Sequence, residues 1–303
     1  MTAQTDPKGK AIINIYTNIH SGFGSYNDKR GFELERSYLG YQYTLSEQLT
    51  LKAIMDIGYS DNVNDFHRIA YIKNAMVQWR KNQWIINAGL IGTTQFKLQE
   101  TFWDKRYIIK SFQDEHKFGS SADLGISVTH KLGRYFEIDA IVVNGEGYKK
   151  LQIKDGFLYG IGITYMPNKK FIFRSYISFN EAIDKQYTDE IVWNIFGGYN
   201  HSNLSIGYEY TYQYNRQYTK DNDYDGMSAY ITYNIGKKYS LFGRWDYISS
   251  SQNKNANKHI IYTGFEWQIN KFIKISPNVR YYICDDFNKK DAIYLYINAA
   301  FIL

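Results

Sequence analysis

Hydrophobic and polar residues alternate strictly along most of the chain. In residues 204–214, LSIGYEYTYQY, Ile206 and Tyr208 alternate with Gly207 and Glu209. Strict alternation over several residues is typical of a β-strand whose two faces meet different environments. Such stretches predict sixteen strands, at 11–23, 32–44, 49–60, 69–80, 83–92, 121–131, 134–144, 156–166, 170–180, 190–200, 203–214, 226–235, 238–249, 259–269, 271–283 and 292–303.

The two faces of the predicted strands differ from those of a soluble β-protein. A soluble sandwich or solenoid would have an outer face rich in Lys and Glu. Here the apolar face is wide and tipped with tyrosine, whereas the other face carries Gly, Ser, Thr, Asn and single charges. A transmembrane β-barrel has this pattern, with lipid outside and water inside. In residues 204–214 the side chains expected to face lipid are Ile206, Tyr208, Tyr210 and Tyr212, and those expected to face water are Glu209, Thr211 and Gln213.

The connections between the predicted strands alternate between short and long. The short ones are 46–47, 81–82, 132–133, 167–169, 201–202, 236–237 and 270–271. The longer ones are 24–31, 61–68, 93–120, 145–155, 181–189, 215–225, 250–258 and 284–291. Outer-membrane barrels have short periplasmic turns, longer external loops and, in bacterial single-chain examples, an even number of strands. The predicted fold is therefore an all-β, 16-stranded antiparallel transmembrane β-barrel in the outer membrane of a Gram-negative bacterium.

The two ends of the chain fit a closed barrel. The last predicted strand ends in "YLYINAAFIL", which has no charge. A barrel has no open edge only when its last strand pairs with its first, so we expect 292–303 to pair with 11–23. We expect residues 1–10 to be a leader or N-terminal extension, and 11–303 to form a single barrel domain. Pro277 cannot donate a ladder hydrogen bond, which predicts a bulge or a pairing break there.

Composition excludes several other classes of protein. The 303 residues include 30 Tyr, 18 Phe and 6 Trp, which favours strands. No apolar run reaches about 18 residues, so a transmembrane helix is excluded. The formal net charge of +6 is mild and scattered, which argues against a nucleic-acid partner. The six histidines are never at metal-ligand spacing, and "DNDYDG" at 221–226 lacks the final Glu of a calcium loop, so we expect no metal and no cofactor.

The longest predicted loop, 93–120, holds too much apolar surface to stay in water. It contains Phe96, Phe102, Trp103, Tyr107, Ile108, Ile109, Phe112 and Phe118. Loops this long are usually functional or disordered. We expect this third external loop to fold inward and narrow a pore, with Trp103 and Phe112 packed on the wall and with Lys105, Arg106 and Lys110 facing the pore. The candidate constriction residues are Glu100, Asp104, Lys105, Arg106, Lys110, Asp114, Glu115 and Lys117, and His116 lies among them.

Charges on the inward face of the strands are candidates for the opposite side of the constriction. If the alternation holds, they are Arg36, Lys52, Asp56, Asp123, Glu137, Asp139, Arg174, Glu209, Arg244, Asp246, Glu266, Lys274 and Arg280. Opposed acidic and basic clusters would create a transverse field that favours small dipolar solutes. Alternatively, each charge is a solvated lumen group or part of an ion pair that anchors the loop. We expect only a weak preference for anions, because acidic loop residues oppose the basic ones.

Three segments resemble a known porin family. They are "FELERSYLGYQYTL", "ETFWDKRYIIKSFQDEHKFGSSADLGISV" and "VVNGEGY". These segments are similar to Bacteroidetes outer-membrane porins akin to the phosphate-selective porins O and P. The resemblance implies passive diffusion of small hydrophilic solutes, without establishing phosphate as the solute. "VNGEGY" lacks the Lys-Ser/Thr and helix of a phosphate-binding loop, so we interpret it as a tight strand exit.

The sequence leaves other functions open. Outer-membrane enzymes use ten or twelve strands and a catalytic cluster, so we expect a channel that is not an enzyme. A substrate-specific outer-membrane transporter, or a barrel that binds a ligand or partner, remains the alternative. The expected partners are outer-membrane lipids and lipopolysaccharide, small hydrophilic solutes or anions, and two further copies of the chain in a homotrimer, which is an analogy with sixteen-stranded porins.

Overall fold

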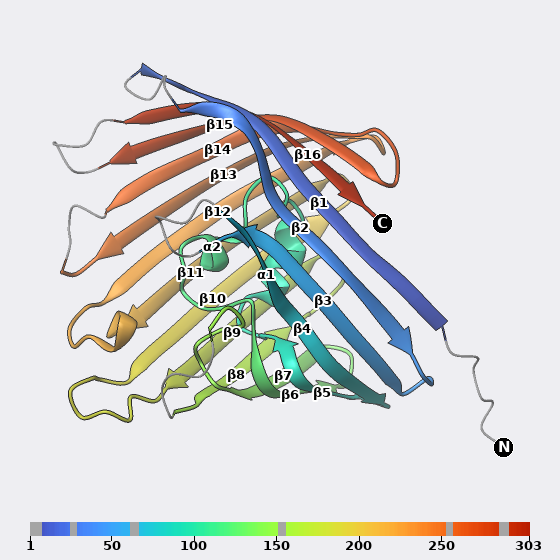
Figure 1. The fold of residues 1–303 in the computed structure, drawn as a ribbon, viewed down its shortest axis with the longest axis vertical. Helices are drawn as coiled ribbons and strands as arrows, with labels where there is room; N and C mark the ends of the chain where they lie inside the picture. Colours follow the sequence, from blue (N-terminus) through green and yellow to red (C-terminus); the bar gives the residue numbers. More distant parts are fainter. Residues whose placement is uncertain (1–7, 25–28, 61–66, 151–155, 253–256, 285–290) are drawn as a thin grey trace.

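Sixteen antiparallel strands close into a barrel in the computed structural model, which describes residues 8–24, 29–60, 67–150, 156–252, 257–284 and 291–303 (Figure 1). The strands are β1 (Lys8–Phe23), β2 (Arg30–Thr44), β3 (Leu49–Tyr59), β4 (Arg68–Lys81), β5 (Trp84–Gly92), β6 (Ala122–Leu132), β7 (Phe136–Val143), β8 (Leu158–Tyr165), β9 (Phe171–Asn180), β10 (Glu190–His201), β11 (Leu204–Tyr214), β12 (Tyr224–Ile235), β13 (Tyr239–Ser250), β14 (Lys258–Gln268), β15 (Ile273–Cys284) and β16 (Ala292–Ile302). The short helices are α1 (Lys97–Trp103), α2 (Phe112–Glu115) and the 3-10 turn η2 (Arg216–Tyr218). The predicted fold class is confirmed.

The barrel closes between its first and last strands, as predicted. β1 pairs with β16 from Asn14–Ile302 to Phe23–Ile293, and the amide of Leu303 donates to the Ile13 carbonyl at 2.9 Å. The chain can therefore end on an apolar strand, because that strand has partners on both sides. β1 begins at Lys8, inside the range predicted to be a leader, and residues 1–7 lie outside the described residues.

The short and long connections lie at opposite ends of the barrel. The short ones, between consecutive described strands, are 45–48, 82–83, 133–135, 166–170, 202–203, 236–238 and 269–272. We call this the turn end and the opposite one the loop end. β1 begins and β16 finishes at the turn end, on the right in Figure 1. The predicted alternation of connection lengths is confirmed.

The two faces of the strands point as predicted, but not every inward face meets water. In β11, Ile206 and Tyr208 point outward and are 42% and 45% exposed. Glu209 and Thr211 point inward and are both 0% exposed, and Gln213 is also buried. The expectation that these three residues face water was wrong, because the loop between β5 and β6 covers this part of the inner wall.

Two β-bulges break the alternation on one side of the barrel. Between β1 and β2 the pairs Tyr16–Arg36 and Thr17–Leu34 leave Glu35 without a partner. Between β3 and β4 the pairs Ile54–Asn74 and Met55–Ile72 leave Lys73 without one. An extra residue in a strand changes the face of the sheet to which side chains at the bulge point. Each bulge therefore adds a charged side chain to the inner wall.

The predicted irregularity at Pro277 is present on one side of its strand. β15 pairs with β16 through Pro277–Ile297, whereas its pairing with β14 is missing between Gly264–Asn278 and Trp267–Ile275. The register is the same on both sides of the gap, so this is a pairing break and not a bulge. None of the helices in the described part of the chain is long and apolar enough to span a membrane.

Candidate functional site

The connection between β5 and β6, residues 93–121, folds into the barrel and carries α1 and α2 (Figure 1). We call it the third loop. Its large apolar side chains are buried, namely Phe96, Trp103, Tyr107, Ile108, Ile109, Phe112 and Phe118, while Phe102 is half-buried. Burying this apolar surface favours the inward position by roughly 1.5–3 kcal/mol for each such side chain. The inward fold predicted for this loop is therefore present.

Aromatic contacts fix the middle of the third loop to the inner wall. The Trp103 ring meets Tyr230 of β12 and Phe242 of β13, with centroid distances of 5.2 and 6.0 Å. Its indole N–H donates to the Ile109 carbonyl at 2.9 Å. Phe112 packs with Phe118 and Ile248. Both wall anchors predicted from the sequence are confirmed.

Lys105 is buried against the wall instead of facing the pore. Its ammonium lies 3.3 Å from the Glu266 carboxylate of β14 and donates to the Ser240 hydroxyl. Tyr107 donates to the other Glu266 oxygen at 2.8 Å. Burial lowers the pKa of Lys105, and Glu266 offsets only part of that effect. The prediction that Lys105 is a pore-facing charge was wrong, because its charge is needed to pair with a buried carboxylate.

Inward-facing charged residues of β11 and β13 also bind the third loop. Arg244 binds Asp246 at 2.6 Å and donates to the Lys110 carbonyl. His116 contacts the same Asp246 carboxylate at 2.9 Å. These groups are buried, so their ionic and hydrogen-bonding partners must be inside the protein. At β11, Gln113 donates to the buried Glu209 carboxylate at 3.0 Å.

The loop continues along the wall to the closing strands. Arg280 of β15 donates to the Ile108 carbonyl at 2.7 Å, and Asn298 of β16 donates to the Tyr107 carbonyl at 3.2 Å. The third loop is thus bonded to the inner wall across β11 and β13 to β16. Two polar cavities lie on the other side of the barrel, beside β2 to β9.

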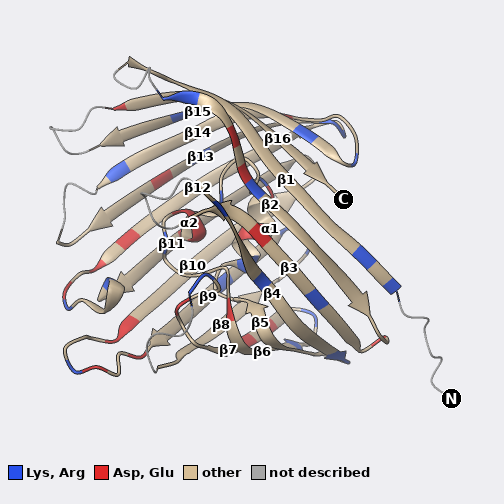
Figure 2. Ribbon diagram, in the orientation of Figure 1, with Lys and Arg blue, Asp and Glu red and all other residues tan. Residues whose placement is uncertain are grey.

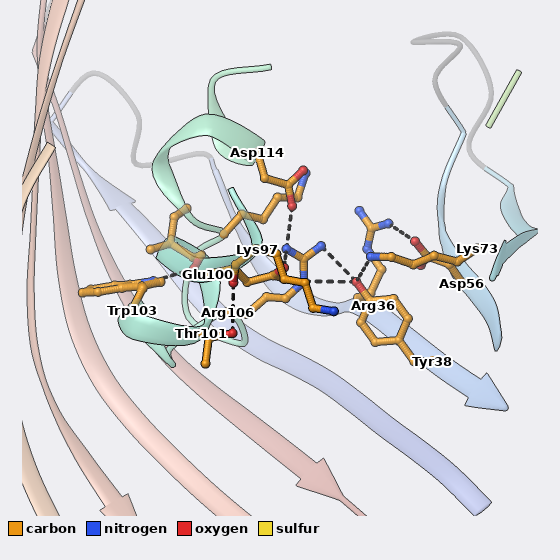
Figure 3. Close-up of polar contacts among 12 residues, drawn as sticks. Arg36, Tyr38, Asp56, Lys73, Lys97, Glu100, Thr101, Trp103, Arg106 and Asp114 are labelled. Carbon is orange, nitrogen blue, oxygen red and sulfur yellow. Dashed lines mark hydrogen bonds and ion pairs between the residues drawn. The ribbon is translucent and has the colours of Figure 1, made fainter. Parts of the chain in front are cut away.

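Arg106 links the third loop to β2. Its guanidinium donates to the Tyr38 hydroxyl at 3.1 and 3.2 Å, and it pairs with Glu100 and Asp114 at 2.7 and 2.5 Å (Figure 3). Burial would raise the pKa of Asp114, but Arg106 and Lys110 outweigh it and hold that pKa well below its usual range. Asp114 therefore stays ionised at neutral pH, and it pairs with the Arg106 charge.

Three lysines line the remaining space without an acidic partner among the described residues. Lys52 of β3, Lys73 of β4 and Lys97 of α1 line one cavity of about 240 Å³, together with Gln42, Thr50, Asn74, Gln78, Asn87 and Glu100. Figure 3 shows Lys73 and Lys97 beside Tyr38 and Arg106, and Figure 2 shows blue positions along β3 and β4 opposite the red of α2. A second cavity of about 370 Å³, beside β4 to β9, shares Gln78, Asn87, Gly92 and Lys97 with the first. These two cavities form one polar passage on the turn-end side of Arg106.

The predicted site residues lie in several different surroundings. Most inward charges bind loops or each other: Arg36 with Asp56, Arg174 with Asp139, Asp123 with backbone amides, and Glu209, Arg244, Asp246, Glu266 and Arg280 with the third loop. Lys52 and Glu137 line the passage, and Lys274 lies near Glu266 and the 81%-exposed Asp104. Lys110 and Glu115 line a separate cavity towards the loop end, and Lys117 is exposed.

Lys73 and Tyr38 were not among the predicted site residues. The predicted inward set contained only charged residues, so it left out Tyr38, which lies on the same face as Arg36. Lys73 lies at a bulge, where strict alternation fails. The sequence does carry a signal for both bulges, because the apolar positions change phase between Leu34 and Leu39 and between Ile72 and Val77. Lys97 lies in the third loop but was not singled out there. Among the described residues, no group of acids, histidines and cysteine could hold a metal ion.

Solved structures share this architecture across almost the whole chain. An anion-selective porin from Comamonas acidovorans has a TM-score of 0.77 at 12% identity, covering 98% of this chain and 100% of its own. OmpF of Salmonella typhi, in complex with daunomycin, has a TM-score of 0.73 at 11% identity, covering 97% and 98%. A trimer form of OmpT, an outer-membrane protein of Vibrio cholerae, has a TM-score of 0.67 at 12% identity, covering 98% and 99%.

Comparisons of sequence identify no related protein. No protein-family model matches the chain, and no curated protein matches it. At identities of 11 and 12%, the structural likeness is one of fold alone. The chain therefore has the closed, sixteen-stranded, porin-like barrel fold of outer-membrane proteins.

Proposed function

We propose that this protein is an outer-membrane porin of a Gram-negative bacterium, a passive diffusion channel for small hydrophilic solutes or ions. The observation that carries the proposal is the third loop, which fills one side of a closed barrel and leaves a polar passage on the other. A passage lined by amides, hydroxyls and lysines hydrates small solutes without binding them tightly. The porins with the same fold support this function.

The charges around the passage favour anions weakly. The cations are Arg36, Lys52, Lys73, Arg80, Lys97, Arg106 and Arg174, and the anions are Asp56, Glu100, Asp114, Glu137 and Asp139, so seven positive and five negative charges leave a net charge of +2. Arg36 and Arg106 are paired with those carboxylates, so the three lysines carry the excess. A net positive constriction lowers the barrier for anions relative to cations. The anion-selective porin of the same fold is consistent with this preference.

An enzymatic role has less support. The described residues contain a serine, a histidine and an aspartate in contact, but Ser228 donates to the Asp246 carboxylate at 2.7 Å and His116 contacts that carboxylate too. A nucleophilic serine must instead donate to the histidine, which then takes its proton. All three side chains are also buried beneath the third loop. This cluster therefore supports an anchoring role.

The finer assignments are also proposals. We place the chain with the Bacteroidetes porins akin to the phosphate-selective porins O and P, on the three segments that resemble them. We propose a homotrimer surrounded by outer-membrane lipids and lipopolysaccharide, since a trimer form of one protein with this fold is known. The outward faces of the strands are apolar, as contacts with lipid or with a second copy require.

A planar-bilayer measurement tests the function. We expect the purified barrel to form ohmic, step-like channels, with a reversal potential on the anion side in a salt gradient. Silence of a correctly folded barrel, combined with tight binding of a solute, would favour a substrate-specific transporter or a ligand-binding barrel. Silence without binding would also contradict the proposal.

A further inference from the structure

A tyrosine outside the third loop also reaches into the barrel. Tyr148 follows the strand exit after β7, yet its hydroxyl donates to the Asp56 carboxylate of β3 at 2.5 Å. Asp56 also pairs with Arg36 of β2 at 2.7 Å, and an Arg36 nitrogen lies 3.5 Å from the Tyr148 hydroxyl. We call these three residues the Tyr148 bridge. Among the described residues, the hydrogen bonds and ring contacts of the Tyr148 side chain go to Arg36, Asp56, Tyr71 and Lys73, all outside the third loop.

The bridge spans several strands of the wall. The Tyr148 amide donates to the carbonyl of Ala122 at the start of β6, so the backbone of Tyr148 is fixed to that strand. β4 and β5 lie between β6 and β3 in the sheet. Three strand spacings amount to roughly 14 Å along the wall. A direct contact over that span cuts across the curved inner surface of the barrel, instead of following it.

The turn that carries Tyr148 is built to hold this position. Asp123 accepts hydrogen bonds from the amides of Gly145 and Gly147 at 2.8 and 3.1 Å. Both glycines have positive φ, +91° and +82°, a region that other residues adopt at a cost. A Cβ on Gly147 would lie 2.5 Å from the Ser120 hydroxyl. The "NGEGY" segment is therefore more than a tight strand exit, because it aims a side chain into the lumen.

The bridge meets the lysine passage from the loop end. The Lys73 ammonium lies 5.6 Å from the centre of the Tyr148 ring and 3.5 Å from the Tyr38 hydroxyl. Tyr38 in turn accepts from Arg106 of the third loop. Tyr148, Asp56, Arg36, Lys73, Tyr38 and Arg106 thus form one chain of contacts from the strand exit after β7 to the third loop.

Two cavities lie on either side of this chain of contacts. On the loop-end side lies a cavity of about 260 Å³, which Glu33, Tyr59, Arg36 and Arg106 line. On the turn-end side lies the cavity that holds Lys52, Lys73 and Lys97. β2 runs from the loop end to the turn end, so Glu33 precedes and Gln42 follows the level of Tyr38.

We propose that the Tyr148 bridge is a second constriction, which sets the size of the solutes that pass from the loop-end cavity to the lysine passage. The proposal rests on the porin function, and it assigns size selection to a residue outside the third loop. Tyr148 keeps its proton, because burial and the nearby Asp56 both raise the pKa of its phenol above the usual value. The phenol therefore remains a hydrogen-bond donor across the neutral pH range.

Substitutions at Tyr148 test the proposal in the full-length barrel. We expect Tyr148→Ala to raise single-channel conductance roughly 1.5-fold and to admit larger polyethylene glycols in a solute-exclusion assay, because a ring and its hydrogen bond leave the passage. Tyr148→Phe keeps the ring but cannot bind Asp56, so its effect should be smaller. Tyr135→Ala removes an exposed tyrosine from a turn-end connection and is the matched control.

A variant at a different residue makes the test independent of the tyrosine itself. Gly147→Ala should displace the turn and raise conductance as Tyr148→Ala does. Unchanged conductance and an unchanged exclusion size in folded Tyr148→Ala and Tyr148→Phe would overturn the second constriction. If the wild-type barrel conducts and the substitutions leave its conductance and exclusion size unchanged, the porin function stands and this inference alone fails. A wild-type barrel that does not conduct would instead contradict the porin function.

Discussion

Replacing the three passage lysines by glutamine should remove the anion preference that we propose for the channel. Lys52, Lys73 and Lys97 line one cavity and have no acidic partner among the described residues. Arg36 and Arg106 contribute less, because carboxylates lie within 2.7 Å of both. The triple variant changes the net charge of the constriction from +2 to −1, because three positive charges are lost.

The size of the effect follows from Coulomb's law. An ion that passes about 5 Å from one ammonium group gains roughly 0.8 kcal/mol at the dielectric constant of water. Screening at 0.1 M salt reduces this to about 0.5 kcal/mol, because the Debye length is then about 10 Å. Each lysine attracts an anion and repels a cation by this amount, so it changes the ratio of anion to cation permeability roughly fivefold, and all three together change it on the order of a hundredfold.

The reversal potential in a salt gradient measures this ratio. We expect the variant Lys52→Gln, Lys73→Gln, Lys97→Gln to move it from the anion side to the cation side. A matched control replaces Lys169, Lys237 and Lys238, which are exposed on turn-end connections, with glutamine. The reasoning is refuted if both triple variants shift the reversal potential equally, since the effect would then come from overall charge, or if neither shifts it.

Three further predictions concern the third loop and the barrel faces. The pKa of Asp114 lies below its usual value, so the contribution of its carboxylate to loop docking is complete at neutral pH and is lost as pH falls below about 4. Acid should therefore increase the open-channel noise of the wild-type protein but not that of Asp114→Asn. Trp103→Ala removes about 3–5 kcal/mol of wall packing and should raise conductance, with Trp103→Phe intermediate; equal conductance in all three proteins would contradict the anchoring role. In membranes, a water-soluble thiol reagent should label Asn87→Cys in the passage faster than Tyr208→Cys on the lipid face, and the reverse order would show that the faces are misassigned.

The architecture could be predicted from sequence because a membrane barrel imposes a period of two on every strand. Lipid and water meet opposite faces, so each strand alternates, and the lengths of the connections reveal which end is which. The closing pair of strands also followed from the uncharged C-terminal segment. The bulges at Glu35 and Lys73 were missed, since they change the phase of alternation within a strand that otherwise looks regular.

The candidate site was harder to predict than the fold. The inward position of the third loop followed from its aromatic residues, but the partner of each charge did not. Lys105 faces the wall because it pairs with Glu266, which is buried there. Glu209 is shielded from water because Gln113 of the third loop binds it. Tyr148 binds Asp56, which lies 92 residues away in sequence. Such pairings depend on the path of loops through three-dimensional space, and alternation carries no information about that path.

The central claim is that the third loop narrows a water-filled pore, and its removal tests this most directly. Single-channel conductance should be compared between wild type and a variant that lacks residues 104–116, both shown to be folded barrels. We predict ohmic steps for wild type, a higher conductance for the variant and a weaker ion preference, because the passage becomes wider than the reach of the lysines. Equal conductance and equal reversal potential in the two proteins would contradict the account.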